Sequence, residues 1–422
     1  MHANPSAGSD TNPELLSAIV KASETYSIVA SQDIVDVRGL KLWAKGQPVS
    51  VALQQRLLER KLQTPLESCL AAESGVTPFT LHDQLLACLD EDSPLSKALR
   101  PWGASLVQEL KRIPLHSVAQ LLLTTALATR PETFPHAVQA MALAGALTKT
   151  QRSGVDMRMA MIAGLLHDIG EVYIQPLYLD RSMALDAVGH KHLVVHPRVA
   201  QMLLDSSTDY PKAIGRAIGE HHERLDGSGY PARLREDALS PLGRLLAVVE
   251  VTLGVLREAQ APLTRASFAL RVVPGEFDPL WTSPIFNMAK DAQEGLLEVS
   301  APEDAISPLQ TIGDRIQTAF QLGSGLKEHG RTDAHLAIVE TALERLGRLR
   351  IAWNALGVWG APTGPQTHSE RTEMAMAHGE LHIRLRDLQR ECMLLAERLG
   401  DAEKERMAPL WQGMFDAVAV VY

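Results

Sequence analysis

Two stretches of the sequence decide the fold: AGLLHDIGE at residues 163–171 and GEHHERLDGSGYP at residues 219–231. Each places two adjacent metal-competent side chains at the polar end of a run that otherwise indicates a helix, His167 with Asp168 and His221 with His222. Neighbouring residues on a helix point about 100° apart, so an apolar packing face seldom needs two polar groups side by side. A lone buried histidine is usually just hydrogen-bonded, but two such pairs together predict a metal centre.

Both stretches also resemble the signatures of a known family. HDIGE and HHERLDGSGYP are similar to the two motifs of the HD-GYP domain, a bacterial branch of the HD phosphohydrolases. The resemblance covers roughly residues 130–285. It implies a mainly α fold built on an HD-type helical bundle, and hydrolysis of cyclic di-GMP at a centre of two or three metal ions in bacterial second-messenger signalling.

The resemblance implies further ligands. His136, on the helix before the HD pair, and His196, which precedes a proline and a helix, match metal-binding histidines of the family. Glu132, one turn before His136, matches an extra ligand of the three-metal members, although the helix macrodipole alone favours an acid there. Glu250 stands where the family typically has the Asp that closes the site, and Gly254 replaces its second Asp. The implied metal ligands are Glu132, His136, His167, Asp168, His196, His221, His222 and Glu250.

This ligand set predicts a particular chemistry. Five histidines and up to three carboxylates exceed what one tetrahedral ion needs and suit two or three divalent ions bridged by Asp168, with Fe or Mn expected. Ions about 3.5 to 4 Å apart stabilise both the attacking and the departing oxygen when a phosphodiester is cleaved by in-line displacement. We assign the catalytic positions to His167, Asp168 and Glu171. The predicted substrate-binding residues are Gly229, Tyr230, Pro231, Arg257 and Arg265.

The chain departs from the family at its substrate-binding cations. Hydrolytic members usually have Lys after HDIG, where this chain has Glu171, a carboxylate that would repel a phosphate unless it binds metal or a partner cation. The basic segment that normally follows the closing Asp is missing, and Arg257 and Arg265 replace it only roughly by position. Two hypotheses stand: a phosphodiesterase converting cyclic di-GMP to the linear dinucleotide and/or GMP, or a catalytically inactive HD-GYP module that binds nucleotide or a signalling partner. A third is hydrolysis of another cyclic dinucleotide or of a nucleotide monophosphate.

A chain of 422 residues is long enough for two or three domains. The only strand pair expected is a hairpin turning at residues 36–39. Three helices are expected between Thr77 and Arg130, with breaks near residues 92–94 and 113–114. The N-terminal region is equally consistent with a sensory or docking module and with a buttress for the core. The expected parts are a disordered tail at 1–13, an N-terminal α module with the β-hairpin at 14–112, an HD-GYP domain at 113–285 and a C-terminal helical region at 286–422.

Composition restricts the classes of binding partner and the cellular environment to be expected. A net charge of -9 argues against DNA as a partner, although a small local basic site for a phosphorylated ligand stays open. No apolar run approaches the 20 or so residues of a membrane span. Three distant cysteines, Cys69, Cys88 and Cys392, predict reduced thiols in a cytoplasmic protein. The expected partners are a cyclic dinucleotide and a protein bound through the GYP loop (residues 229–231) or the C-terminal helices. Those helices fit a homodimer or packing on their own domain.

Overall fold

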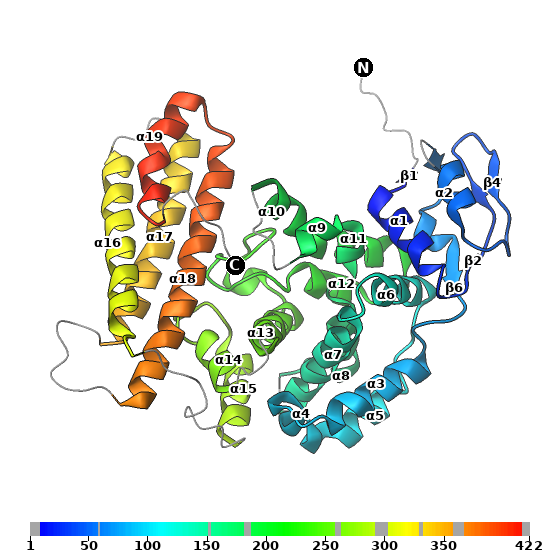
Figure 1. Ribbon diagram of the computed structural model, residues 1–422, viewed down its shortest axis with the longest axis horizontal. Helices are drawn as coiled ribbons and strands as arrows, with labels where there is room; N and C mark the ends of the chain where they lie inside the picture. The colour runs from blue at the N-terminus through cyan, green and yellow to red at the C-terminus, as the bar shows by residue number, and fades with distance from the viewer. Residues whose placement is uncertain are drawn as a thin grey trace. The chain divides into compact units, whose positions relative to one another are not determined.

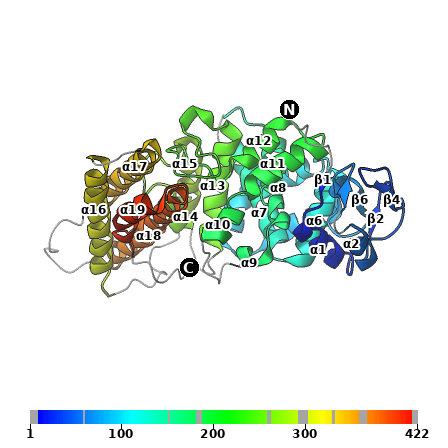
Figure 2. The same cartoon turned by 90° about the horizontal axis from the view of Figure 1, so that it is seen from above.

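The computed structural model describes residues 9–57, 60–150, 153–180, 187–257, 263–291, 303–328, 332–357 and 367–415 (Figures 1 and 2). The fold is mainly α with a few short strands, as predicted. The chain divides into two compact units, one of residues 1–181 with 190–253 and the other of residues 182–189 with 254–422. All the predicted metal ligands lie in the first unit.

Short strands begin the first unit. The expected hairpin is confirmed, since β3 pairs with β4 and Gly39 takes a φ of 82° in the turn. The expectation that this is the only strand pair is wrong, because β1 pairs with β5 and β2 with β6. Strands of two or three residues with distant partners leave no periodic pattern to recognise. The elements are β1 (Ser9–Asp10), α1 (Pro13–Ala22), β2 (Ile28–Ala30), β3 (Ile34–Val35), β4 (Lys41–Trp43), α2 (Val51–Leu57), β5 (Lys61–Leu62), η1 (Leu66–Ser68) and β6 (Leu70–Ala72).

The structure describes only part of the tail that the sequence predicts to be disordered, residues 1–13. Residues 1–8 lie outside the described residues, whereas Ser9 and Asp10 form β1 opposite Leu62 and Lys61. The prediction of disorder is therefore wrong for these two residues, which find a strand partner about 50 positions later in the chain.

Four α-helices, rather than the three predicted, lie between Thr77 and Arg130. The breaks at Pro94 and Pro114 are where the sequence predicts them, but a 3-10 turn that contains Pro101 divides the middle helix. A proline lacks the N–H that continues a helical ladder. The elements are α3 (Pro78–Asp90), α4 (Pro94–Leu99), η2 (Arg100–Trp102), α5 (Gly103–Leu110) and α6 (Ser117–Thr129).

Two glycines permit close packing of the segments that carry the predicted ligands. Helices α7 and α8 lie side by side, and a Cβ on Gly164 of α8 would sit 2.6 Å from the carbonyl oxygen of Ala140 on α7 (Figure 1). A Cβ on Gly170 would lie 2.2 Å from the carbonyl oxygen of His196. Hydrogen is thus the only side chain with room at either contact. The elements are α7 (Thr133–Thr150), α8 (Met157–Leu166), η3 (Ile169–Tyr173), α9 (Pro176–Leu179), α10 (Ala187–Leu193), α11 (His196–Ser207), α12 (Lys212–Gly219), η4 (Glu236–Ala238) and α13 (Pro241–Leu256).

The N-terminal elements pack directly on the segment that follows the HD pair. Helix α1 contacts α6 and η3, and the Asn12 side chain donates from Nδ2 to the Tyr173 carbonyl oxygen at 3.4 Å. Burial raises the pKa of the Tyr173 hydroxyl, and the neighbouring Glu67 carboxylate raises it further. These contacts are those expected of a buttress, and the sensory or docking interpretation stays a prediction.

The second unit contains a helical bundle with its own core. Leu381, Leu385 and Leu388 on α18 are fully buried together with apolar residues of α16 and α17. The apolar face of α18 is therefore buried within its own bundle, while Ile383 and Met393 are exposed. No helix in the described part of the chain is long and apolar enough to cross a bilayer. The elements are α14 (Leu263–Ala269), α15 (Pro279–Asp291), α16 (Ile306–Glu328), α17 (Asp333–Ala355), α18 (His368–Ala396) and α19 (Asp401–Gln412).

Candidate metal centre

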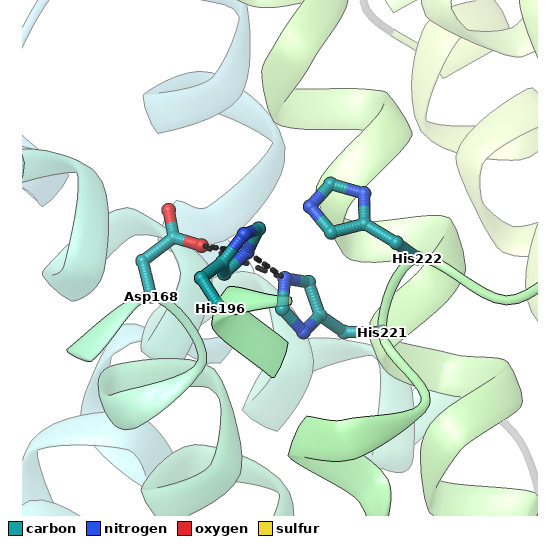
Figure 3. A group of neighbouring side chains, drawn as sticks. All are labelled: Asp168, His196, His221 and His222. Atoms are coloured by element: carbon teal, nitrogen blue, oxygen red, sulfur yellow. Dashed lines mark hydrogen bonds and ion pairs between the residues drawn. The ribbon is translucent and has the colours of Figure 1, made fainter. Parts of the chain in front are cut away.

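Seven of the eight predicted ligands converge on one centre. They come from five separate segments: α7, the junction of α8 with η3, the first turn of α11, the loop after α12, and α13. Their donor atoms form two groups that share Asp168, and within each group all donor atoms lie within 4.8 Å of one another. The first group is Asp168, His196, His221 and His222 (Figure 3), and the second is His136, His167, Asp168 and Glu250.

The two oxygens of Asp168 face different groups. Oδ1 lies 3.5 Å from Nε2 of both His196 and His221 (Figure 3). Oδ2 lies 3.2 Å from Nε2 of His167 and 3.5 Å from Nε2 of His136. One oxygen toward each group is the arrangement that a bridging carboxylate needs.

Backbone hydrogen bonds orient three of the imidazoles. The Nδ1–H of each ring donates to the carbonyl oxygen three residues earlier in the chain, at 2.7, 2.7 and 2.6 Å for His167, His196 and His221. A carbonyl oxygen can only accept, so the neutral ring carries its proton on Nδ1. In this neutral form Nε2 has a lone pair toward the centre, as in histidines that ligate metal through one nitrogen and donate through the other.

These nitrogens approach each other closely. Nε2 of His196 lies 3.2 Å from Nε2 of His221, and the Nε2 atoms of His136 and His167 are 3.3 Å apart. Two lone pairs at this distance repel unless a proton or a cation lies between them. The buried Oε2 of Glu250 lies 3.3 Å from Nε2 of His167 and has no hydrogen-bond partner in the described structure. Nitrogen and oxygen donors converging in this way fit divalent cations.

Burial and charge divide the imidazoles into two kinds. Burial lowers the pKa of His221, and it lowers that of His222 well below its ordinary value. Burial opposes protonation of His167 and His196 too, but Asp168 outweighs it and holds both pKa values above the ordinary one. Burial likewise favours the protonated acid at Asp168, yet the surrounding imidazoles, first of all His167, hold its pKa well below the usual range. The carboxylate is therefore ionised, as a ligand must be.

The GYP loop packs against His222, a member of the first group of candidate ligands. Glu223 is fully buried and accepts the backbone N–H groups of Ala232 and Leu234, just after the loop, at 2.6 and 3.0 Å. A Cβ on Gly229 would lie 2.4 Å from the His222 carbonyl oxygen, so the loop can approach this ligand only because Gly stands there. The Tyr230 ring stacks on the His222 ring with centroids 4.5 Å apart, and the peptide bond to Pro231 is cis. The loop thus fixes the ring of His222.

Glu171 forms an ion pair with Arg130. Its Oε2 accepts from Nη2 of Arg130 at 2.6 Å, and the side chains of Glu171 and Arg130 are only 12% and 23% exposed. The negative charge that distinguishes HDIGE from HDIGK is therefore compensated within the chain. The sequence did not predict a role for Arg130, which lies a few residues before the helix of His136, or for Glu223, which lies within the second motif directly after the histidine pair.

One predicted metal ligand is missing from both donor groups. Glu132 is exposed, precedes the first residue of α7 and belongs to neither ligand group. Its expected place one helical turn before His136 fails because α7 begins at Thr133. Arg257 and Arg265 belong to the second unit, and their substrate-binding role stays a prediction.

Comparisons with known proteins agree with the two motifs. Residues 121–266 match the family model of the HD domain. Cyclic di-GMP phosphodiesterase PA4108 from Pseudomonas aeruginosa is 34% identical over 212 residues, which are 49% of this chain and 47% of that protein. The 3'3'-cGAMP-specific phosphodiesterase 1 from Vibrio cholerae is 29% identical over 150 residues, 34% of this chain and 33% of that protein. The chain thus spans less than half the length of these curated relatives.

One solved structure was also matched. Bd1817, a HDG"Y"P protein from Bdellovibrio bacteriovorus, is 14% identical, and the match covers 68% of this chain and 98% of that one. Its TM-score of 0.35 is too low to establish a shared fold.

Proposed function

Because residues 121–266 form an HD domain that carries both signatures of the HD-GYP family, this part of the chain belongs to that family, and we propose that the protein is a metal-dependent cyclic dinucleotide phosphodiesterase. Cyclic di-GMP is the proposed substrate, with the linear dinucleotide and/or GMP as products. Two relatives named for this class of reaction support the proposal.

The observation that carries the proposal is the shared carboxylate. Asp168 directs one oxygen to each of two groups of nitrogen and oxygen donors, so one side chain can hold two cations at a fixed separation. Two divalent ions, proposed to be Fe or Mn, would supply an activated water and compensate the charge on the scissile phosphate when bound. Asp168 would hold both ions. One ion would be held with it by His136, His167 and Glu250, and the other by His196, His221 and His222.

The remaining residues prepare this site. Nδ1 hydrogen bonds to the backbone fix the imidazole rings before any ligand arrives, which removes reorganisation from the reaction. The GYP loop supports His222 through Tyr230 and is proposed to border the substrate. Arg130 compensates Glu171, so this carboxylate does not act as an unpaired charge against a phosphate.

Hydrolysis of cyclic di-GMP by protein loaded with Mn or Fe tests the proposal. We expect turnover in the native chain and none in Asp168→Ala or His167→Ala. His192→Ala is the matched control, because this histidine is exposed and belongs to neither group, so its loss should leave turnover unchanged. A panel including 3'3'-cGAMP identifies the preferred dinucleotide. A metal-loaded native chain that binds dinucleotides without cleaving any would instead establish an inactive binding module.

A further inference from the structure

A basic groove lies outside the metal centre, in the N-terminal part of the first unit. It is a half-open cavity of about 740 Å³ between the β3–β4 hairpin, α2 and β5. Cavities of this size accommodate small organic ligands. Its lining residues are Asp36, Val37, Arg38, Leu40, Lys41, Leu42, Gln55, Arg56, Arg60 and Lys61.

Positive charge dominates the lining. Five of the ten described residues in the lining are Lys or Arg, in a chain whose net charge is -9. The one carboxylate among the lining residues, Asp36, is buried and accepts the backbone N–H groups of Arg38 and Leu40, so it shapes the hairpin turn. Its Oδ2 lies 3.5 Å from Arg60, while Lys41 pairs with Asp33 beside the groove at 2.5 Å. Lys41 and Arg60 thus have carboxylate partners, whereas Arg38 and Arg56 have none among the described residues.

Two arginines are available to an anion. The side chain of Arg38 is exposed and has no hydrogen-bond or ion-pair partner in the part of the chain that the structure describes. The Arg56 guanidinium lies over the Trp43 ring, 5.4 Å from its centroid, and donates once, from Nη1 to the Leu42 carbonyl oxygen at 3.2 Å. Stacking and this single bond hold the Arg56 fork in place while its other N–H groups are left to donate. Guanidinium forks of this kind match the geometry of phosphate oxygens.

Apolar side chains lie beside these cations. Val37 and Leu40 are 43% and 53% exposed at the tip of the hairpin, in the same lining. An exposed apolar surface next to arginine forks suits a ligand with both a flat ring and phosphates. We propose that this groove binds a nucleotide, with Arg38 and Arg56 on its phosphates and Val37 and Leu40 against its nucleoside. The site is separate from the metal centre and does not depend on the phosphodiesterase activity proposed above.

Calorimetric titration of the full chain in EDTA, with ATP and with tripolyphosphate as probes, tests this proposal. Chelation removes metal-dependent binding at the HD centre. We expect saturable binding of one ATP per chain, with tripolyphosphate at least about fivefold weaker because it lacks the nucleoside. Arg38→Gln with Arg56→Gln should weaken ATP at least about tenfold, and added salt should weaken the native interaction.

The matched control removes two positive charges elsewhere on the first unit. Lys97 and Arg112 have side chains 53% and 57% exposed and do not line the groove, so Lys97→Gln with Arg112→Gln should leave ATP affinity within about twofold of native. Arg38→Gln alone, at a hairpin position without side-chain partners, keeps the test valid if Arg56→Gln misfolds, and about a threefold loss is expected. Absence of ATP binding, or equal losses in the two double variants, overturns the site. Equal affinity for ATP and tripolyphosphate overturns the assignment to a nucleotide.

Discussion

The pairing of Arg130 with Glu171 should be a strong interaction that a double-mutant cycle can measure. Nη2 and Oε2 are 2.6 Å apart, and both side chains are mostly buried. Two unit charges about 4 Å apart attract by about 4 kcal/mol at an effective dielectric constant of 20, and desolvation offsets part of this. Hydrogen bonds to charged groups contribute about 1.5 to 3 kcal/mol net. We therefore expect a coupling free energy of about 2 kcal/mol.

The assay is urea unfolding of native protein, Arg130→Gln, Glu171→Gln and the double variant, all in EDTA so that bound metal does not contribute. Arg130→Gln alone should cost about 3 kcal/mol, since it leaves a mostly buried carboxylate without its cation. The exposed pair of Lys97 and Asp92, with side chains 53% and 89% exposed, is the control and should couple by about 0.5 kcal/mol or less. A coupling for Arg130 and Glu171 as small as that of the control pair would refute the compensation argument.

Three further predictions concern packing, ligation and pH. Gly164→Ala should destabilise the protein by about 3 kcal/mol, because the added Cβ would overlap the backbone of α7. Gly254→Ala on α13 is the control: its Cβ would have no atom within 4 Å, so this variant should be neutral or stabilised by up to about 1 kcal/mol. Thermal unfolding measures the stability of both variants against the native protein. Elemental analysis should find native metal content in Glu132→Gln and about one ion fewer in His136→Ala, and metal loss in Glu132→Gln would restore Glu132 to the ligand set. Burial raises the pKa of the Cys88 thiol from 9.0 to about 11, so the unfolded chain ionises first and stability falls as pH rises from 9 to 11. The loss is about 2 to 3 kcal/mol relative to Cys88→Ala, and equal pH slopes in the two proteins would contradict it.

The sequence predicted the centre better than its surroundings. Adjacent polar pairs at helix ends marked His167, Asp168, His221 and His222, and the motif resemblance added His136, His196 and Glu250, all of which the structure brings together. Glu132 is absent from both donor groups, because a spacing of four residues places two side chains on one helical face only if both residues lie in the helix.

Contacts between residues far apart in the chain could not be predicted from the sequence. Arg130 and Glu171 are 41 positions apart, and β2 finds its partner β6 about 40 positions later, so neither contact leaves a local periodicity. The basic groove was equally hidden, because its cations come from a hairpin, a helix and a strand that only folding brings together. A net negative charge of the whole chain gave no sign of where positive charge would collect.

The central claim is that Asp168 joins two cation sites. Elemental analysis of anaerobically purified native protein and of Asp168→Ala, both confirmed as folded by circular dichroism, tests it most directly. The account predicts about two transition-metal ions per native chain and a loss of most of both in the variant, because each group shares this carboxylate. Less than about one ion in the native chain, or an unchanged metal content in Asp168→Ala, would contradict it.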